Sequence, residues 1–348
     1  MSLYAPVRDV LFRFDPELVH KLTLTLIGTS GRVPPLASLL KKLFTATPQP
    51  VTCFGLTFPN WVGLAAGYDK DGVAWKGLAC LGFGHIEIGT VTLKPQPGNP
   101  QPRLFRLPEC QALINRLGFP GRGAAFVAGQ LRHRPSRDVI LGVNLGKNKD
   151  TPLERAVEDY LALFDIFAPL ADYLAINVSS PNTVGLRQLQ ARQALDDLLG
   201  SLNLRRKAAQ AELGRRIPIL VKVAPDLSDA ELGDVLEVIQ KQEMDGVIAT
   251  NTTIQRQGLS PDILQLSSRA SESGGLSGLP LFPLSLAMVK KIRQQWGEAL
   301  PVIGVGGILG AEQALQMLDA GANLIQVYTG LVYKGPGLVK EILTHLTQ

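Results

Sequence analysis

Eight apolar runs recur along the chain from residue 61 onward, and helical patterns separate them. Each run is a nearly continuous stretch of Val, Ile, Leu or Ala, which is typical of strands buried on both faces of a parallel sheet. They lie at 61–67, 85–92, 140–146, 173–180, 218–224, 246–252, 301–308 and 323–330. Helical patterns such as 152–167, 229–242 and 311–320 lie between them. Eight such units favour a closed (β/α)8 TIM barrel over an open sheet.

The eight runs end in polar or glycine residues. Examples are Lys70 after the first run, Asn144 in the third, Asn177 in the fourth and Thr250 in the sixth. Buried polar groups need partners, and the chemistry of this barrel fold lies at the C-terminal ends of its strands. The pattern therefore predicts a binding site at that end. Residues 51–58, centred on Gly55, are expected to form a hairpin that closes the other end.

The first 47 residues differ from the barrel pattern. Asp15 and Pro16 begin a predicted helix whose apolar residues recur at helical spacing until Gly28 and Gly31. A second short helix is expected after the pair of prolines at 34–35. Six basic and three acidic residues give this segment a net charge of +3. Periodicity alone slightly favours a helical pair that caps the barrel over helices that lie in a membrane interface. We therefore expect residues 1–47 to be a helical extension and residues 48–348 to be the barrel.

The composition narrows the class of protein. The 348 residues exceed the roughly 250 of a single barrel, which leaves room for insertions. The net charge of +5 and the lack of a basic run argue against nucleic acid as a partner. The four histidines lie far apart in sequence, so no metal site is expected. No run approaches the roughly 20 apolar residues of a spanning helix, so we expect a soluble or peripheral protein.

Three features point to chemistry. Gly307 and Thr329 lie at the ends of the seventh and eighth runs, where TIM barrels usually bind phosphate, although two glycine-rich turns would look the same. Lys222 lies in the middle of an apolar run, where a buried lysine is costly unless it has a charged or polar partner. It could stabilise an anion inside the barrel, unless its side chain reaches solvent. Ser180 lies in a Ser-Ser-Pro-Asn sequence that is also ordinary turn chemistry. No GxSxG motif surrounds Ser180, so a hydrolase nucleophile is not indicated.

Eight motifs in family order resemble the dihydroorotate dehydrogenases. They are AAGYDKDG (65–72), EIGTVT (87–92), NRLGF (115–119), NVSSPNT (177–183), TNTT (250–253), GGLSG (274–278), GVGGI (304–308) and VYTG (327–330). The N-terminal extension and the serine at position 180 resemble the quinone-dependent class, because the soluble class has a cysteine there and lacks the extension. The resemblance implies oxidation of (S)-dihydroorotate to orotate, with FMN as cofactor and a membrane quinone as acceptor, in pyrimidine (UMP) biosynthesis.

The resemblance also implies the residues of the site. Ser180 would be the base that removes a proton from ring carbon 5, while a hydride leaves ring carbon 6. Thr183 and an ordered water are candidates to relay the proton. The substrate residues would be Lys70, Asn115, Arg116, Leu117, Gly118, Phe119, Asn177, Asn182, Asn251 and Thr252. The FMN residues would be Ala65, Ala66, Gly67, Tyr68, Asp69, Thr90, Asn144, Asn177, Lys222, Thr250, Gly278, Gly307, Tyr328 and Thr329.

The second half-reaction would use the N-terminal helices. His20 and Arg106 match positions that line the family's quinone tunnel, although periodicity alone makes His20 a solvated helix residue. The resemblance implies a monomer held peripherally on the cytoplasmic side of the cell membrane through these helices.

The residues by themselves leave two other functions open. A non-redox isomerase or lyase acting on a phosphorylated substrate would explain the phosphate loops but not the amide-rich strand ends. A non-enzymatic flavin- or membrane-binding module would not need Lys70, Ser180 or the asparagines.

Overall fold

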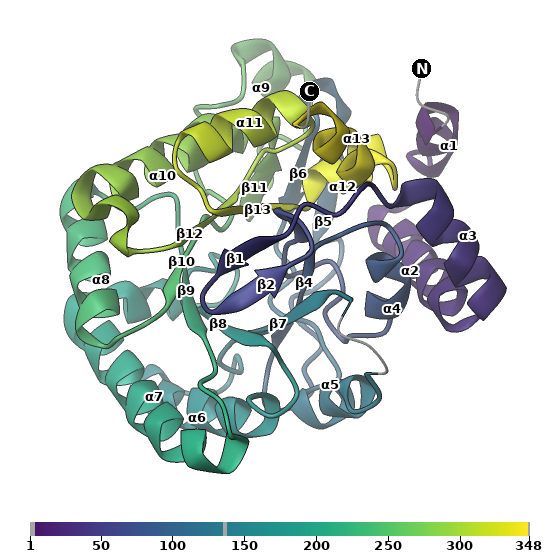
Figure 1. Cartoon of the computed structure of the whole chain (residues 1–348). Helices are drawn as coiled ribbons and strands as arrows, with labels where there is room; N and C mark the ends of the chain where they lie inside the picture. The colour runs from purple at the N-terminus through teal and green to yellow at the C-terminus, as the bar shows by residue number, and fades with distance from the viewer. Residues whose placement is uncertain (1–3, 135–137, 347–348) are drawn as a thin grey trace.

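The barrel predicted from the apolar runs is present in the computed structural model, which describes residues 4–134 and 138–346 (Figure 1). Parallel strands close into a ring because the last strand pairs with the first. In ring order the strands are β3 (Val62–Leu64), β4 (His85–Val91), β7 (Ile140–Leu145), β8 (Tyr173–Asn177), β9 (Ile219–Val223), β10 (Gly246–Ala249), β12 (Val302–Val305) and β13 (Leu324–Val327). Most predicted runs extend past the ends of these strands, because their polar residues leave the sheet and enter the loops of the site.

Helices surround the strands and bury one apolar face against them (Figure 1). They are α4 (Trp75–Ala79), α5 (Ala124–Leu131), α6 (Ala156–Phe167), α7 (Arg192–Leu213), α8 (Asp229–Lys241), α10 (Phe282–Trp296), α11 (Ala311–Asp319), α12 (Thr329–Lys334) and α13 (Leu338–His345). Local sequence sets their ends. The Ser228 hydroxyl accepts from Glu231 N–H, and the Glu231 carboxylate accepts from Ser228 N–H, which starts α8 with a capping box.

The predicted hairpin closes the N-terminal end of the barrel. Its strands are β1 (Val51–Cys53) and β2 (Leu56–Phe58). Phe58 is fully buried against residues at the strand beginnings, including Ile140 and Tyr173. The barrel therefore opens at one end only.

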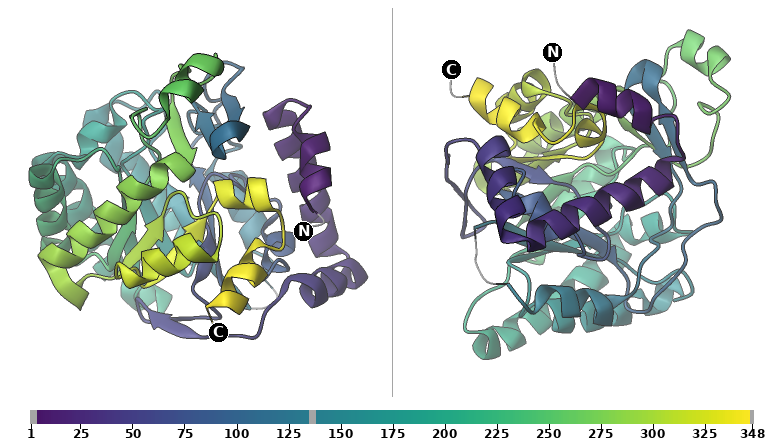
Figure 2. Two further views of the ribbon diagram at one scale, coloured as in Figure 1. Left: turned by 90° about the horizontal axis from the view of Figure 1, so that it is seen from above. Right: turned by 90° about the vertical axis from the view of Figure 1, so that its right-hand side faces the viewer.

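Three helices precede the hairpin: α1 (Tyr4–Leu11), α2 (Pro16–Arg32) and α3 (Pro34–Phe44). They gather on one side of the barrel, near α12 and α13 (Figure 2). The Asp15 carboxylate caps α2 by accepting from the N–H groups of Glu17 and Leu18 at 3.0 and 2.9 Å. The expected end of this helix at Gly28 and Gly31 is wrong, because the helix continues to Arg32.

The two glycines of α2 serve packing instead of termination. A Cβ atom on Gly28 would lie 2.7 Å from the carbonyl oxygen of Val73, and one on Gly31 would lie 2.2 Å from the nitrogen of Gly77. The absence of a side chain at both positions lets α2 lie directly on α4.

The division of the chain into a helical extension (1–47) and a barrel (48–348) stays a prediction.

A small antiparallel sheet lies beside the open end of the barrel. It contains β5 (Leu104–Leu107), β6 (Ala112–Asn115) and β11 (Gly275–Gly278), with β6 in the middle. None of these three strands belongs to the eight predicted runs. The segment between β10 and β11 also contains α9 (Pro261–Leu266). The sheet has its own apolar cluster, in which Leu107, Ile114 and Leu276 are buried.

Candidate active site

One cavity of about 930 Å³ lies at the C-terminal ends of the barrel strands and is bordered by the small sheet. Most of the residues predicted for FMN and substrate line it. They are Ala65, Ala66, Gly67, Lys70, Thr90, Asn115, Leu117, Gly118, Phe119, Asn177, Ser180, Asn182, Lys222, Thr250, Asn251, Thr252, Gly278, Gly307, Tyr328 and Thr329. The barrel thus brings together residues that are far apart in sequence. Ala65 and Thr329, for example, are 264 positions apart.

Four predicted residues do not line the cavity. The Arg116 guanidinium lies 2.5 Å from the Glu272 carboxylate and stacks on Phe105. Asp69 accepts from the N–H groups of Val73 and Ala74, just before α4, and Asn144 lies beneath the cavity floor. Tyr68 packs edge-on against Tyr328, in the wall of the cavity. A ligand contact from Arg116 or Asp69 would therefore have to come from its main chain.

Four asparagines form two hydrogen-bonded pairs around the cavity. Asn182 donates to Asn115 at 3.0 Å, and Asn251 donates to Asn177 at 3.3 Å. Asn177 also donates to the Thr90 hydroxyl at 2.9 Å. These contacts hold the amides in fixed orientations, and such a set matches a planar ligand that bears both donors and acceptors.

Ser180 is buried at the cavity wall, just after β8. Its hydroxyl oxygen accepts from Asn182 N–H at 3.3 Å, which leaves the hydroxyl proton uncommitted among the contacts of the described residues. Thr183, three positions later, is also buried, and its hydroxyl has no hydrogen-bond partner within the described part of the chain. Both hydroxyls are thus free of the contacts that would fix their orientation.

Glycines line the cavity at the ends of β11 and β12. Gly278, Gly306 and Gly307 have φ values of +94°, +128° and +74°, which residues with a Cβ atom rarely adopt. A Cβ on Gly307 would lie 2.6 Å from the nitrogen of Phe282. Close to these glycines on β11, the Ser277 hydroxyl contacts that of Thr329 at 2.8 Å. Bare backbone and paired hydroxyls are groups that bind a phosphate.

A polar network fills the barrel beneath the cavity. Glu87 is fully buried in β4 and accepts from Asn144 at 2.8 Å, Gln326 at 3.0 Å and Tyr173 at 3.1 Å. The Lys222 ammonium lies 3.8 Å from the same carboxylate. Burial lowers the pKa of Lys222, while Glu87 opposes this shift. Glu87 is therefore a charged partner of Lys222 within the protein.

Sequence reasoning missed Glu87 and Gln326. Each lies in the middle of an apolar run, so the argument applied to Lys222 would have found both. It also missed Ser277, Leu281, Val305 and Ile308 as lining residues.

A second pocket of about 920 Å³ lies on the other side of Lys70, against α2. The Glu17 carboxylate accepts from Arg103 at 2.7 and 3.1 Å, and these bonds lower the pKa of Glu17 to about 2. This ion pair fastens α2 to the segment that precedes β5. Burial lowers the pKa of Lys70 to about 8.

A third pocket of about 520 Å³ separates α1 and α2 from the barrel. Its lining is mostly apolar or aromatic: Tyr4, Leu11, Phe12, Pro16, Val19, His20, Thr23, Tyr68, Leu104, Arg106, Leu113, Tyr328 and Val332. The predicted tunnel residues His20 and Arg106 both lie here. Tyr328 also lines the main cavity, so it belongs to the walls of both spaces.

His20 and Arg106 are both held in place within this pocket. Burial lowers the pKa of His20 to about 3, so its ring is neutral at physiological pH. His20 packs edge-on against Tyr68, with ring centroids 5.0 Å apart. Arg106 donates to the carbonyl of Phe14 at 2.8 Å and lies 4.5 Å from the ring of Phe12, which holds the turn between α1 and α2.

Known proteins resemble the chain over its whole length. The dihydroorotate dehydrogenase family profile matches residues 49–348. A dihydroorotate dehydrogenase (quinone) from Thiobacillus denitrificans is 48% identical, and the similarity covers 99% of this chain and 100% of that protein. Its counterpart from Stenotrophomonas maltophilia strain K279a is 47% identical, over 97% of this chain and 94% of the relative.

Solved structures of dihydroorotate dehydrogenases also resemble this chain. The dihydroorotate dehydrogenase of Eimeria tenella in complex with ferulenol superimposes with a TM-score of 0.85 and 36% identity, over 95% of this chain and 90% of that chain. The ligand-free Eimeria enzyme gives a TM-score of 0.84 and 37% identity, over 95% and 94% of the two chains. The match extends through the N-terminal helices as well as the barrel, and the chain therefore belongs to the dihydroorotate dehydrogenase family.

Proposed function

We propose that this protein oxidises (S)-dihydroorotate to orotate and passes the electrons to a membrane quinone, as a step of pyrimidine biosynthesis. One observation carries the proposal. The cavity that holds Ser180, Lys70 and the paired asparagines shares Tyr328 as a lining residue with the third, largely apolar pocket. One of these spaces is a polar site for a small acid, and the other is an apolar site for a lipid-tailed acceptor. Two such sites with a shared wall match a redox reaction in two steps.

FMN is the proposed cofactor, and the cavity fits it. The glycines at 278, 306 and 307 leave space that a Cβ atom would fill, and the hydroxyl pair of Ser277 and Thr329 lies beside them. These groups would hold the phosphate, while Lys222 would contact the ring system from below. When bound, FMN accepts the hydride from ring carbon 6 of the substrate.

The substrate would occupy the part of the cavity nearest Ser180. Lys70 would pair with the substrate carboxylate, and the asparagine pairs would bind the ring amides and carbonyls. The Ser180 hydroxyl would take the proton from ring carbon 5. An isolated hydroxyl is a weak base, so its own proton must move on, and the buried hydroxyl of Thr183 is the candidate relay.

The pocket between the helices and the barrel is the proposed quinone tunnel. Its lining is suited to a lipid tail, and His20 and Arg106 are suited to a quinone carbonyl. Arg106 carries a charge, whereas His20 would act as a neutral hydrogen-bonding group, because its pKa is about 3.

The helices are also the proposed membrane contact. Apolar side chains on their outer face are 38–60% exposed: Val7, Val10, Phe14, Leu18, Leu22, Leu26, Val33, Leu36, Leu39 and Leu43. So large an apolar surface indicates an interaction site, and helices of this kind can lie in a membrane interface. Within the described residues, no helix is long and apolar enough to cross a membrane. Attachment on the cytoplasmic side and the monomeric state remain predictions.

The test of the whole proposal is anaerobic spectroscopy of the purified protein. A yellow protein should bleach when dihydroorotate is added and regain its colour when a quinone follows. A colourless protein that binds phosphate would favour a non-redox barrel enzyme. A yellow protein that dihydroorotate does not bleach would favour a binding module.

Lys70 gives the site a predictable pH dependence. Burial lowers its pKa to about 8, with Arg103 reinforcing the shift and Glu17 and Asp71 opposing it. Only the protonated amine pairs with a carboxylate, so the Kd for orotate should be constant below pH 8 and rise about tenfold per pH unit above it. Titration followed by the flavin spectrum measures this. Lys70→Met should bind weakly with no such rise, and a constant wild-type Kd up to pH 9.5 would exclude the assignment.

Lys222→Met should weaken FMN binding roughly 10- to 100-fold, because a charge-assisted contact is lost. It should also lower the free energy of unfolding of the apoprotein by about 1–3 kcal/mol, because the Glu87 carboxylate loses its cation. Apoprotein titration with FMN and chemical denaturation measure the two effects. Adding Glu87→Gln should restore the stability but not the affinity. An unchanged FMN affinity in Lys222→Met would make the lysine purely structural.

A further inference from the structure

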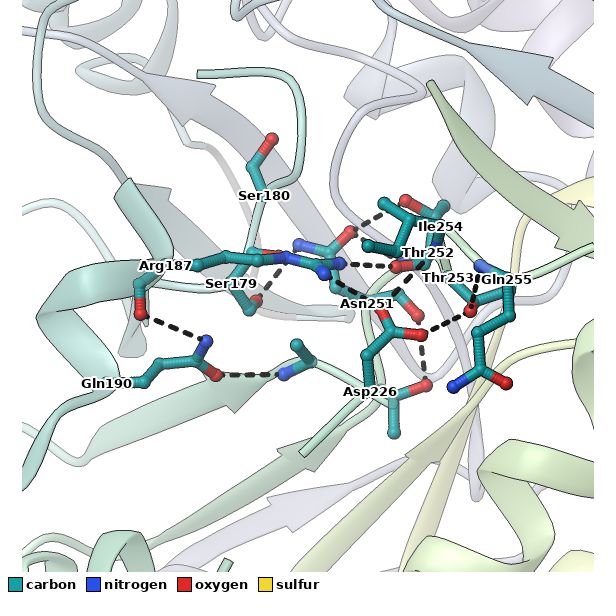
Figure 3. Close-up of polar contacts among 12 residues, drawn as sticks. Ser179, Ser180, Arg187, Gln190, Asp226, Asn251, Thr252, Thr253, Ile254 and Gln255 are labelled. Atoms are coloured by element: carbon teal, nitrogen blue, oxygen red, sulfur yellow. Dashed lines mark hydrogen bonds and ion pairs between the residues drawn. The ribbon is translucent and has the colours of Figure 1, made fainter. Parts of the chain in front are cut away.

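Arg187 joins three loops at the open end of the barrel without lining the cavity. It lies in the short helix η3 (Leu186–Gln190), seven positions after Ser180, and its side chain is 23% exposed. Its Nε donates to the carbonyl of Ser179 at 3.1 Å, Nη1 to the Asp226 carboxylate at 2.8 Å and Nη2 to the carbonyl of Thr252 at 3.0 Å (Figure 3).

The three acceptors follow three neighbouring strands. Ser179 comes after β8, Asp226 after β9 and Thr252 after β10. Two of them adjoin proposed site residues, because Ser179 precedes Ser180, and Thr252 itself lines the cavity. One rigid guanidinium thus sets the separation between the loop of the base and the loop that binds the substrate ring.

We propose that Arg187 is a positioning residue that aligns Ser180 with ring carbon 5 of the substrate. The inference rests on the proposed function and deepens it. The guanidinium does not line the cavity, so it acts through the Ser179 carbonyl and the Thr252 carbonyl. A displacement of about 1 Å at a reacting group can cost about 100-fold in rate, so an anchor of this kind matters to catalysis.

The partners of Arg187 are themselves fixed. Asp226 also accepts from the Thr253 hydroxyl and from Ile254 N–H, so both carboxylate oxygens are used (Figure 3). Gln190, at the end of η3, accepts from Ala224 N–H at 3.0 Å and fastens the helix to the end of β9. Arg187 therefore connects the loop after β8 to the loop after β10, and other hydrogen bonds hold each end of this connection in place.

Side chains at the ends of β8 and β10 also meet directly, because Asn251 donates to the Ser179 hydroxyl at 3.0 Å and to the Asn177 side chain at 3.3 Å. Lysine would not replace the arginine. It has one donor group on a flexible stem, whereas the guanidinium is planar and directs its donors along fixed lines. Arg187→Lys keeps the charge beside Asp226 but cannot reach all three acceptors.

The experiment compares the flavin-loaded, full-length Arg187→Lys variant with wild type in anaerobic stopped-flow. Reduction by dihydroorotate should be about 100-fold slower. The deuterium isotope effect from ring carbon 5 should increase, because proton removal becomes limiting, and the Kd for orotate should rise only a few fold. Reoxidation by a quinone should be unchanged, since the tunnel lies on another side of the barrel. A merely structural role would not alter the isotope effect.

Arg206 supplies a matched control. It also donates to an aspartate, Asp245, and to a backbone carbonyl, that of Glu243, but at the N-terminal end of β9. Arg206→Lys should lower the melting temperature and leave flavin reduction and the isotope effect at wild-type values. Equal rates and isotope effects in Arg187→Lys and wild type would overturn the proposal. So would a loss of rate in Arg206→Lys as large as that in Arg187→Lys.

Asp226→Asn provides a second test of the positioning role if the Arg187→Lys variant fails to fold or to bind FMN. It preserves the shape of the side chain and removes the negative charge that faces Arg187, so reduction should slow about tenfold with the same rise in the isotope effect. Normal reduction in that variant would also overturn the proposal. Failure of the proposed function would look different, because wild-type protein would then not be bleached by dihydroorotate at all.

Discussion

Ser180→Ala is expected to bind FMN and orotate as wild type does and to reduce its flavin 10²- to 10⁴-fold more slowly. The loss is the contribution of a general base, since the hydroxyl would no longer take the proton from ring carbon 5. The substitution removes one weak contact, the 3.3 Å bond from Asn182 N–H, so the fold should persist. Anaerobic stopped-flow measures the rate, and a spectral titration with orotate measures the affinity.

The outcome separates catalysis from binding. A variant with wild-type orotate affinity and melting temperature and a slow reduction step would assign Ser180 to proton removal. Near-normal reduction in Ser180→Ala would rule the residue out. Ser180→Cys should regain activity only if the site stabilises a thiolate, and the buried surroundings of Ser180 oppose that.

Removal of residues 1–47 is expected to abolish reduction of a long-chain quinone while a small soluble dye is still reduced. The cavity keeps all its lining residues in the deletion, because none of them lies before residue 65. The proposed tunnel, in contrast, loses the wall formed by α1 and α2. Binding of the protein to anionic vesicles at low salt should fall as well, since basic side chains near the surface contribute on the order of 1 kcal/mol each.

A blocked tunnel tests the same idea with the helices in place. The deletion uncovers the face of α4 against which Gly28 and Gly31 pack, so it can aggregate. Val19 lines the tunnel and its neighbour Leu18 is 60% exposed, which makes Val19→Trp and Leu18→Trp a matched pair. Val19→Trp should lose quinone activity alone, and Leu18→Trp should keep both activities. Equal rates with dye and quinone in Val19→Trp would leave the helices as a simple cap.

The apolar pattern determined the architecture of this protein. Strands buried on both faces appear as continuous apolar runs. Eight such strands that alternate with helices favour a closed barrel. The helix start at Asp15 and the hairpin around Gly55 depend on neighbouring residues only, so both were predictable. Because each strand of such a barrel ends at the same rim, the polar ends of the runs also identified most of the cavity, including Lys70, Asn177 and Ser180.

Tertiary structure decided what depends on distant partners. The strand β6 pairs on one edge with β11, whose partner residues are about 160 positions away, and no local pattern reveals that pairing. Only the fold shows that Lys222 meets Glu87, that Arg116 turns to Glu272, and that Arg187 links three loops. A pattern along the chain records which side chains are buried, because burial repeats with the period of the element. It does not record which buried groups meet, because that depends on how the strands close into the barrel.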